Sequence, residues 1–426
     1  MTRTIDVRLA HGEHGLDVVL PAANTTVIEP IFEPAAPDPA AALRQALSAP
    51  VAGPPLRERL HRRGSVAISI CDLTRPQPRQ QMVMALLEEM EGLVPLSDVV
   101  ILVATGTHRA NTDAEIREML GSEIPEVVRV VNHDARDSGS LTWCGEFGAG
   151  VPVWLNREWV GAGVRITTGF VEPHFFAGFS GGPKLAAPGL AGLDTVLVLH
   201  DAQRIGHPDA RWGVCEGNPV HDDIRAIAVG TGVDFGFDVI LNRDKEIVAA
   251  YGGDLLAMHA AARRHSRRVA MRRVRAPAEV VVTTNSGYPL DQNLYQAVKG
   301  MSAAATVVKP GGTIVCAAEC RDGFPDHGEY RQVLQQAESP QALLDSIARR
   351  PVTVPDQWQV QVQARVQTQA EVFVHSAHLS DEDLRQAHLL PAPDVSALVA
   401  EQVARAGPDA QVIVLPEGSQ TIPYLD

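Results

Sequence analysis

Apolar, β-branched runs alternate with amphipathic stretches in the first half of the chain, and this alternation constrains the fold more than any other feature. The runs at 65–71, 98–105 and 126–132 predict strands, and the stretches at 79–93 and 111–120 predict helices. Strand–helix–strand order predicts an α/β fold in which helices flank a mostly parallel sheet. In such a sheet ligands bind at the carboxyl ends of the strands.

A basic stretch with repeated arginines, residues 269–277, interrupts the alternation, which then restarts. We therefore predict two α/β domains, residues 1–272 and residues 273–426, and leave open whether roughly the last 15 residues pack back on the first domain. Residues 357–367 alternate Val and Gln and suit either a strand or a helix. The other predicted elements are two short strands within 5–20, a Pro- and Ala-rich connector at 29–55, strands at 164–168, 193–200, 279–284, 313–318, 371–375 and 410–415, and helices at 292–305 and 395–406.

Composition and charge narrow the class of protein. The 426 residues are 45% hydrophobic and 21% charged, which is typical of a globular chain of two or three domains. A formal net charge of −14 argues against nucleic acid or an anionic membrane as a partner, because both are bound by basic surfaces. There is no membrane-length apolar run, no signal-peptide pattern and no C-x-x-C pair, so we expect a cytoplasmic protein with reduced cysteines.

Polar side chains follow the first two predicted strands. Asp72 and Arg75 stand three positions apart, where the guanidinium can bind a carboxylate ligand. A helix cap beside a structural salt bridge is the alternative. His108 comes after a turn at Gly106, and histidine suits proton transfer near neutral pH. A purely structural histidine is the alternative for this position.

A glycine-rich segment follows the predicted strand at 164–168. It matches neither a Walker A loop nor the G-x-G-x-x-G dinucleotide fingerprint. Lys184 stands beside it, where the amine can contact a phosphate or form a covalent bond with a cofactor. A structural glycine turn is the alternative. Exposed backbone amides that can hold a phosphate before a helix are predicted at Gly178, Ser180, Gly181 and Gly182.

Two later segments add polar groups. The apolar run 193–200 ends in His200, which by itself is typical of a core histidine. Tyr295, Gln296 and Lys299 fall within about one helical turn, and a solvated helix face explains them equally well. Taken together, the separated histidines, the basic residues and the loop with its lysine are consistent with one site.

With these segments the sequence resembles a known family, the nickel-pincer-nucleotide lactate racemases. The resemblance extends over essentially the whole chain, and its most specific part is the block at 172–184. It implies a two-domain α/β architecture with the active site in the interdomain cleft. The matching segments, in the order of the family, are DLTRP at 72–76, TGTHR at 105–109, EPHFFAGFSGGPK at 172–184, His200 and YPLDQNLYQAVKG at 288–300.

The resemblance also implies a cofactor, the nickel-pincer nucleotide, which is pyridinium-3-thioamide-5-thiocarboxylic acid mononucleotide. This nucleotide holds nickel through sulfur, ring carbon and sulfur. By position, Lys184 carries it through a thioamide bond, beside the loop of Gly178, Ser180, Gly181 and Gly182, and His200 is the nickel ligand from the protein. Separate cofactor-biosynthesis proteins are implied as partners that load the enzyme.

The same resemblance implies the chemistry at the substrate, a small 2-hydroxy acid. His108 and His174 are the paired general acid and base, placed to act on opposite faces of a prochiral centre. One histidine takes the hydroxyl proton while the C2 hydride passes to the pyridinium ring. The resulting 2-keto acid stays enclosed and receives the hydride on its other face. The residues implied for substrate binding are Arg75 and Lys299 for the carboxylate, with Asp72, Tyr295 and Gln296 in support.

Substrate specificity is predicted from the apolar residues near these motifs. Leu73 stands where a polar histidine is common in the family, and Phe175 and Phe176 follow His174, so we expect a short aliphatic substrate such as lactate or 2-hydroxybutyrate. Arg79 and Arg109 leave a malate racemase open as the alternative, and an aldonate 2-epimerase is a further one. Two hypotheses of another class remain, a zinc-type hydrolase with three histidines and a sensor without catalysis.

Overall fold

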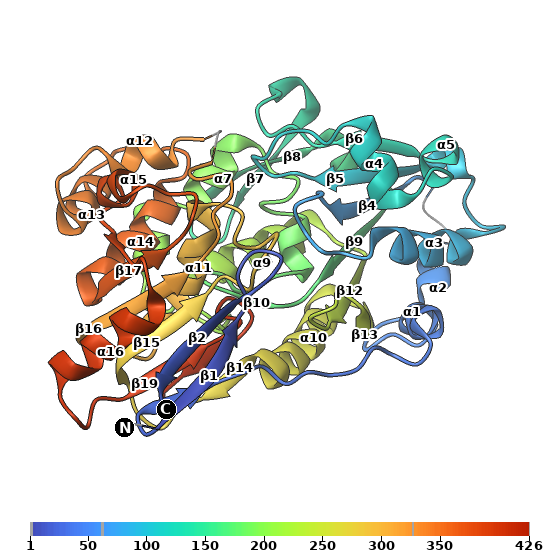
Figure 1. Cartoon of the computed structure of the whole chain (residues 1–426). Helices are drawn as coiled ribbons and strands as arrows, with labels where there is room; N and C mark the ends of the chain where they lie inside the picture. Colours follow the sequence, from blue (N-terminus) through green and yellow to red (C-terminus); the bar gives the residue numbers. More distant parts are fainter. Residues whose placement is uncertain (1–2, 61–63, 326–327, 426) are drawn as a thin grey trace. The chain divides into compact units, whose positions relative to one another are not determined.

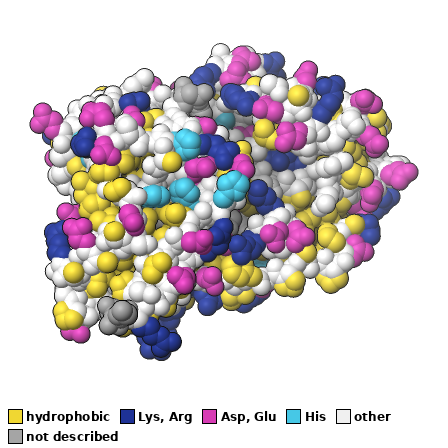
Figure 2. Space-filling model, in the orientation of Figure 1, with side chains coloured by type: hydrophobic (Ala, Val, Ile, Leu, Met, Phe, Trp, Pro, Cys, Tyr) yellow, Lys and Arg dark blue, Asp and Glu magenta, His cyan; other side chains and the backbone are white. Residues whose placement is uncertain are grey.

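The computed structural model describes residues 3–60, 64–325 and 328–425, which form two compact units. Unit 1 consists of the described residues of 1–31, 201–207 and 270–426, and unit 2 of those of 32–200 and 208–269. Figure 1 gives the labels of the helices and strands. No helix among the described residues is long and apolar enough to cross a membrane. Figure 2 shows Lys and Arg side chains interspersed with Asp and Glu over the visible face.

Unit 2 is built on a six-stranded sheet in the order β13-β12-β9-β4-β5-β6. All neighbouring strands are parallel except β12 and β13, which are antiparallel. This confirms the predicted mostly parallel sheet. The strands are β4 (Val66–Cys71), β5 (Val99–Ala104), β6 (Arg129–Asn132), β9 (Val164–Phe170), β12 (Phe235–Leu241) and β13 (Ile247–Gly253). The main helices are α1 (Pro39–Ser48), α3 (Arg79–Met90), α4 (Asp113–Leu120), α9 (Pro219–Thr231) and α10 (Leu255–Ala270), and β7 (Leu141–Phe147) and β8 (Val151–Asn156) form a hairpin.

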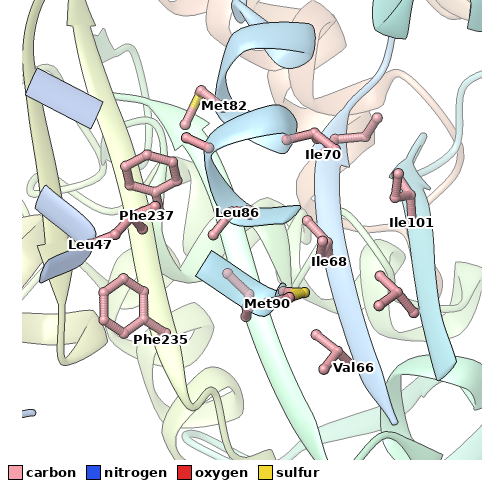
Figure 3. Packing of buried hydrophobic residues seen from close by; sticks show 14 of the residues in the cluster. Leu47, Val66, Ile68, Ile70, Met82, Leu86, Met90, Ile101, Phe235 and Phe237 are labelled. Carbon is pink, nitrogen blue, oxygen red and sulfur yellow. The ribbon is translucent and has the colours of Figure 1, made fainter. Parts of the chain in front are cut away.

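The core of unit 2 lies between this sheet and α3. All six residues of β4 are buried, which explains why its sequence is almost entirely apolar instead of alternating, with Ser69 satisfied by a hydrogen bond to the carbonyl of Leu185. Burial of each such aliphatic side chain contributes about 2 kcal/mol to stability. Figure 3 shows the packing, with labelled side chains from α3 (Met82, Leu86, Met90), β4 (Val66, Ile68, Ile70) and β12 (Phe235, Phe237).

Unit 1 is built on a second six-stranded sheet, in the order β18-β17-β16-β15-β19-β3, and every pairing in it is parallel. Its strands are β15 (Ala278–Thr284), β16 (Val308–Ala317), β17 (Glu371–His375), β18 (Leu390–Pro391), β19 (Val412–Leu415) and β3 (Thr25–Val27). Its helices include α8 (Ala202–Gly206), α11 (Leu294–Ala305), α12 (Tyr330–Leu334), α13 (Pro340–Ala348), α14 (Gln357–Gln369), α15 (Asp381–Gln386) and α16 (Val395–Ala406).

The N-terminal residues, which the sequence analysis placed in the first domain, pack within unit 1. The hairpin of β1 (Thr4–Leu9) and β2 (Leu16–Pro21) shares a hydrophobic cluster with α16, and β3 extends the sheet beside β19. In Figure 1 the dark blue hairpin lies alongside the red C-terminal elements of this unit. Near the other end of the chain, β20 (Ile422–Tyr424) pairs with β14 (Met271–Arg273).

Three local predictions differ from the structure, each for a local reason. The run at 193–200, predicted as a strand, contains helix α7 (Leu193–Leu199), because so short an apolar run fits either period. The strand predicted at 126–132 begins only at Arg129, because the residues before it form the short helix α5 (Ile124–Val127), with Pro125 in the first turn where proline is favoured. The connector at 29–55 contains α1, whose start is fixed by the Asp38 cap and Pro39.

The ambiguous Val/Gln stretch is helix α14, and its buried glutamines explain its composition. Gln361 donates to the carbonyl of Ala202 at 2.8 Å, and Gln363 donates to the carbonyl of Ala387 at 2.8 Å. Buried amides require such partners, because an unsatisfied polar group costs about 1–3 kcal/mol. The glutamines therefore join α14 to its neighbours inside unit 1.

Candidate active site

The carboxyl edge of the unit 2 sheet carries three of the predicted site segments. β4, β5 and β9 are adjacent parallel strands, and Asp72, His108 and His174 each follow one of them within a few residues. The strand order reverses between β4 and β9, since β5 and β6 lie on one side and β12 on the other. Parallel α/β sheets bind ligands at such a switch point.

Asp72 and His108 form the first group at this edge. The Nδ1 atom of His108 lies 2.6 Å from Oδ2 of Asp72, and the hydroxyl of Thr74 donates to Oδ1 of the same carboxylate at 2.6 Å. Asp72 is 4% exposed. Burial alone would raise the pKa of Asp72, but the hydrogen bond from His108 and the nearby charge of Arg75 lower it to about 2. Asp72 therefore stays ionised and fixes the orientation of the His108 ring.

The lowered pKa of Asp72 gives a prediction about acid stability. Because the folded pKa lies below the ordinary value of 3.8, the group stabilises the fold above that value and loses this effect as the pH falls toward 2. The free energy of unfolding of wild type should exceed that of Asp72→Asn by an amount that shrinks by about 2 kcal/mol between about pH 4 and about pH 2. Urea unfolding of both proteins at several pH values measures this difference. A difference independent of pH would contradict the assignment.

Arg75 and Arg79 differ sharply in their surroundings. The Arg79 guanidinium is buried and donates to the backbone carbonyls of Cys71, Asp72, Arg75 and Gln77. Arg79 therefore holds the turn after β4 together. Within the described part of the chain, the half-buried guanidinium of Arg75 makes no hydrogen bond to another side chain, so it can receive a ligand.

Phe176 lies at the centre of a second group. Its ring centroid lies 4.6 Å from that of His174 and 5.3 Å from that of His200, both edge-on, and 5.9 Å from Nζ of Lys184. The ring is 6% exposed. Phe176 therefore gathers three residues that are far apart in the sequence. Sequence reasoning missed this role, because an aromatic residue beside a histidine has no distinguishing signal.

The hydrogen bonds of His174 and His200 indicate which ring nitrogen carries the proton in each neutral side chain. The backbone N–H of Ala177 donates to Nδ1 of His174 at 3.2 Å, so neutral His174 carries its proton on Nε2. His200 is buried and donates from Nδ1 to the carbonyl of Val196 at 2.8 Å, so neutral His200 has its proton on Nδ1 and its lone pair on Nε2.

The glycine loop differs from the expectation of exposed amides. The N–H of Gly182 donates to Oδ2 of Asp238 at 2.6 Å, and the N–H of Ser180 donates to the carbonyl of Glu172 at 2.9 Å. Gly178 packs so closely that a Cβ atom there would lie 2.1 Å from the carbonyl oxygen of Val214. Gly181 and Gly182 are likewise buried. These residues serve close backbone packing, which a glycine-rich sequence does not distinguish from phosphate binding.

Backbone contacts connect the two groups at the sheet edge. The N–H of Gly106, in the loop that carries His108, donates to the carbonyl of Gly189 at 3.0 Å, and the N–H of Gly189 donates to the carbonyl of Lys184 at 3.1 Å. The loops of His108 and Lys184 are thus joined through one residue.

The remaining predicted site residues lie on α11 of unit 1. Nζ of Lys299 donates to Oε1 of Gln296 at 2.8 Å, one turn apart on the helix. The hydroxyl of Tyr295 accepts a hydrogen bond from Nε1 of Trp358 at 3.1 Å. Gln296 and Lys299 therefore lie side by side on α11, while Tyr295 contacts Trp358, a neighbour without any signal in the sequence.

The hypothesis of a three-histidine metal site requires a cluster of donors. Across residues 3–60, 64–325 and 328–425, no three His, Cys, Asp or Glu side chains are grouped so that they could hold a metal ion. His108, His174 and His200 are therefore not arranged as such a site.

Comparisons with known proteins identify the family of the chain. Residues 11–213 match the model of the lactate racemase N-terminal domain, and residues 274–422 match that of the lactate racemase C-terminal domain. The lactate racemase of Thermoanaerobacterium thermosaccharolyticum is 34% identical over 89% of each chain. That of Lactiplantibacillus plantarum is 33% identical over 88% of this chain and 89% of its own.

Solved structures extend the comparison. The lactate racemase apoprotein of Thermoanaerobacterium thermosaccharolyticum superposes with a TM-score of 0.93 at 31% identity, covering 98% of this chain and all of that one. A Thermotoga maritima protein, 18% identical with a TM-score of 0.67, shares the fold. On this identity and coverage, the chain belongs to the lactate racemase family, a family of isomerases.

Proposed function

We propose that this protein racemises short-chain aliphatic 2-hydroxy acids such as lactate, with His108 and His174 as general acid and base. Relatives that share about a third of its sequence are named lactate racemases, which supports this class of substrate. Inversion at C2 requires a proton to leave the hydroxyl group and to return to it, so the reaction needs one base and one acid in each direction.

The observation that carries the proposal is the opposite tautomer of the two histidines. His108 faces the ionised Asp72 through Nδ1–H, so its Nε2 can accept a proton. His174 accepts the Ala177 amide at Nδ1, so its Nε2 carries a proton that it can donate. One histidine is thus prepared as the base and the other as the acid, and the roles exchange when the reaction runs in reverse.

The donor set fits the nickel-pincer nucleotide. We propose that Lys184 carries this cofactor and that His200 binds nickel through Nε2, which its bond to Val196 leaves unprotonated. The buried ring of Phe176 lies beside both side chains, 5.9 Å from Nζ of Lys184 and 5.3 Å from the His200 ring. When bound, the cofactor supplies a reversible acceptor for the C2 hydride. Its loading depends on separate cofactor-biosynthesis proteins, which are the partners we propose.

The substrate carboxylate requires cationic groups. We propose that Arg75 binds it through its guanidinium, whose position Asp72 stabilises by charge. Lys299 is the second proposed anchor, and its amine is held by Gln296 on α11. Tyr295 is held in turn by Trp358. Fixing the carboxylate orients C2, which accelerates a reaction that depends on alignment.

The surroundings of Arg79 and Arg109 favour lactate over malate. A second carboxylate would require a further cation, but Arg79 is buried against backbone carbonyls. Arg109 forms two hydrogen bonds to Glu115, at 2.6 and 2.8 Å. Neither guanidinium is therefore positioned to receive a dicarboxylate.

A chiral assay tests the proposal. The protein is produced together with nickel and the cofactor-building enzymes, and incubated with single enantiomers of lactate, 2-hydroxybutyrate, malate and gluconate. We expect the mirror-image product from lactate or 2-hydroxybutyrate. Activity on malate or gluconate alone would overturn the substrate but keep the reaction class. No turnover by protein whose mass includes the cofactor would favour the sensor hypothesis.

A further inference from the structure

The carboxyl group of Asp238 lies inside the glycine loop, although the sequence predicted a site for a phosphate there. Asp238 belongs to β12 and is 0% exposed. Its Oδ2 accepts the N–H of Gly182 at 2.6 Å. A Cβ atom on Gly181 would lie 2.7 Å from Oδ2, and one on Gly169 would lie 3.1 Å from Oδ1. Side chains at these two glycine positions would therefore collide with the carboxyl group or crowd it.

The glycines of this loop leave room for the carboxyl group. Gly181 and Gly182 both have positive φ, +73° and +51°, a backbone conformation that favours glycine. The loop packs around a side chain of the protein itself and bonds to it through the Gly182 amide, which explains the glycine-rich sequence without an external anion.

The loop is held at a second point by His259 on α10. Its Nε2 donates to the carbonyl of Ser180 at 2.8 Å, and a Cβ atom on Gly182 would lie 2.6 Å from its Cγ. Lys184 follows two residues later, and its own N–H donates to the carbonyl of Gly181 at 3.2 Å. The backbone that carries Lys184 is thus fixed by buried side chains of β12 and α10.

We propose that Asp238 is a positioning residue for Lys184, which fixes the loop in the conformation that presents the lysine amine to the cofactor. This proposal rests on the proposed function, in which Lys184 carries the nucleotide. It gives a reason for a group that costs stability, since a carboxyl group buried without a cation is unfavourable. Burial raises the pKa of Asp238 to about 7, against the lowering effect of the Gly182 amide.

Three variants separate positioning from general stability. Asp238→Val removes the acceptor at similar volume, and Asp238→Asn keeps an oxygen for the Gly182 amide. Asp223→Val is the matched control, because Asp223 is also buried, accepts the Ala149 amide at 2.7 Å and fills the space beside Gly148. The control thus repeats the same chemistry on a turn without site residues.

Two measurements on each folded variant decide the proposal. The first is the rate at which acetic anhydride labels Lys184 in the protein made without cofactor. The second is the fraction of protein whose mass includes the cofactor after production with the cofactor-building enzymes. We expect Asp238→Val to change the labelling rate severalfold and to reduce the loaded fraction about tenfold. Asp238→Asn and Asp223→Val should match wild type in both.

The outcomes are distinguishable from failure of the proposed function. If wild type never gains the cofactor mass, that function fails, while the labelling rates still decide the role of Asp238. Equal labelling in wild type and Asp238→Val would overturn the positioning role. So would an equal effect of Asp223→Val, which would indicate general destabilisation. If Asp238→Val does not fold, Asp238→Asn decides, because impaired labelling in that variant contradicts positioning through the hydrogen bond.

Discussion

Replacing Lys184 by arginine should leave a folded protein that never carries the cofactor and does not racemise lactate. Arginine keeps a positive charge near the Phe176 ring, which Nζ of Lys184 approaches at 5.9 Å, but it offers no primary amine for a thioamide bond. Since the mechanism we propose depends wholly on the attached group, activity should fall by at least about 10⁴-fold. Intact mass and the chiral assay measure the two losses.

Lys245→Arg is the control for this experiment. It makes the same chemical change on an exposed turn of unit 2 and should keep both cofactor mass and activity. A Lys184→Arg protein that still racemised lactate would show that the covalent attachment is not required. Equal losses in both variants would point to an effect on production instead.

The second large effect is expected from His108→Asn and His174→Asn. Asparagine reproduces the Nδ1 side of histidine, so it can still donate to Asp72 at position 108 and accept from Ala177 at position 174. Only the Nε2 atom that we assign to proton transfer is removed. Each variant should therefore keep its cofactor and lose about 10²–10⁴-fold in turnover.

The measurement is turnover from each enantiomer separately, with the cofactor content of the same samples determined by mass. Because the acid in one direction is the base in the other, each substitution should slow both directions. Wild-type turnover in either variant would contradict the two-histidine assignment. Loss of the cofactor mass would instead assign the histidine to binding.

The sheet edge of unit 2 is the part that sequence reasoning could predict. Unbroken apolar strands can be recognised by composition, and the residues that follow them necessarily lie at one edge of a parallel sheet. The neighbourhood of Asp72 and His108 follows from this rule and is present at 2.6 Å. The same rule places His174 after the next strand, β9.

Other parts of the site depend on contacts that leave no local pattern. Phe176 touches His200 and Lys184 only after the chain has folded back, and no period or spacing records this. Asp238 is a single polar residue in an otherwise apolar strand, and nothing in the sequence predicts its contact with the glycine loop. A glycine-rich sequence by itself does not distinguish a loop that binds a phosphate from one that packs around a carboxyl group of the protein.

The sequence does not indicate that the first strands of the chain belong to unit 1, for a similar reason. β3 has three residues, too few for a recognisable period, and its partner is β19, almost the full chain away. A pairing of that separation is determined by the completed sheet and not by local propensity.

The pairing of β3 with β19 determines how late during translation the first strands can form their native contacts. Every segment of unit 2 has been synthesised once residue 269 has emerged, so its core can close early. The first strands of unit 1 emerge before unit 2 is synthesised. However, Val18 and Leu20 pack against α16, and Thr25 pairs with Val412, and these partners are synthesised near the end of the chain. During most of translation their apolar face lacks its native cover, and such a face is what chaperones bind in a nascent chain. The earliest residues to leave the ribosome are thus among the last to reach their final neighbours.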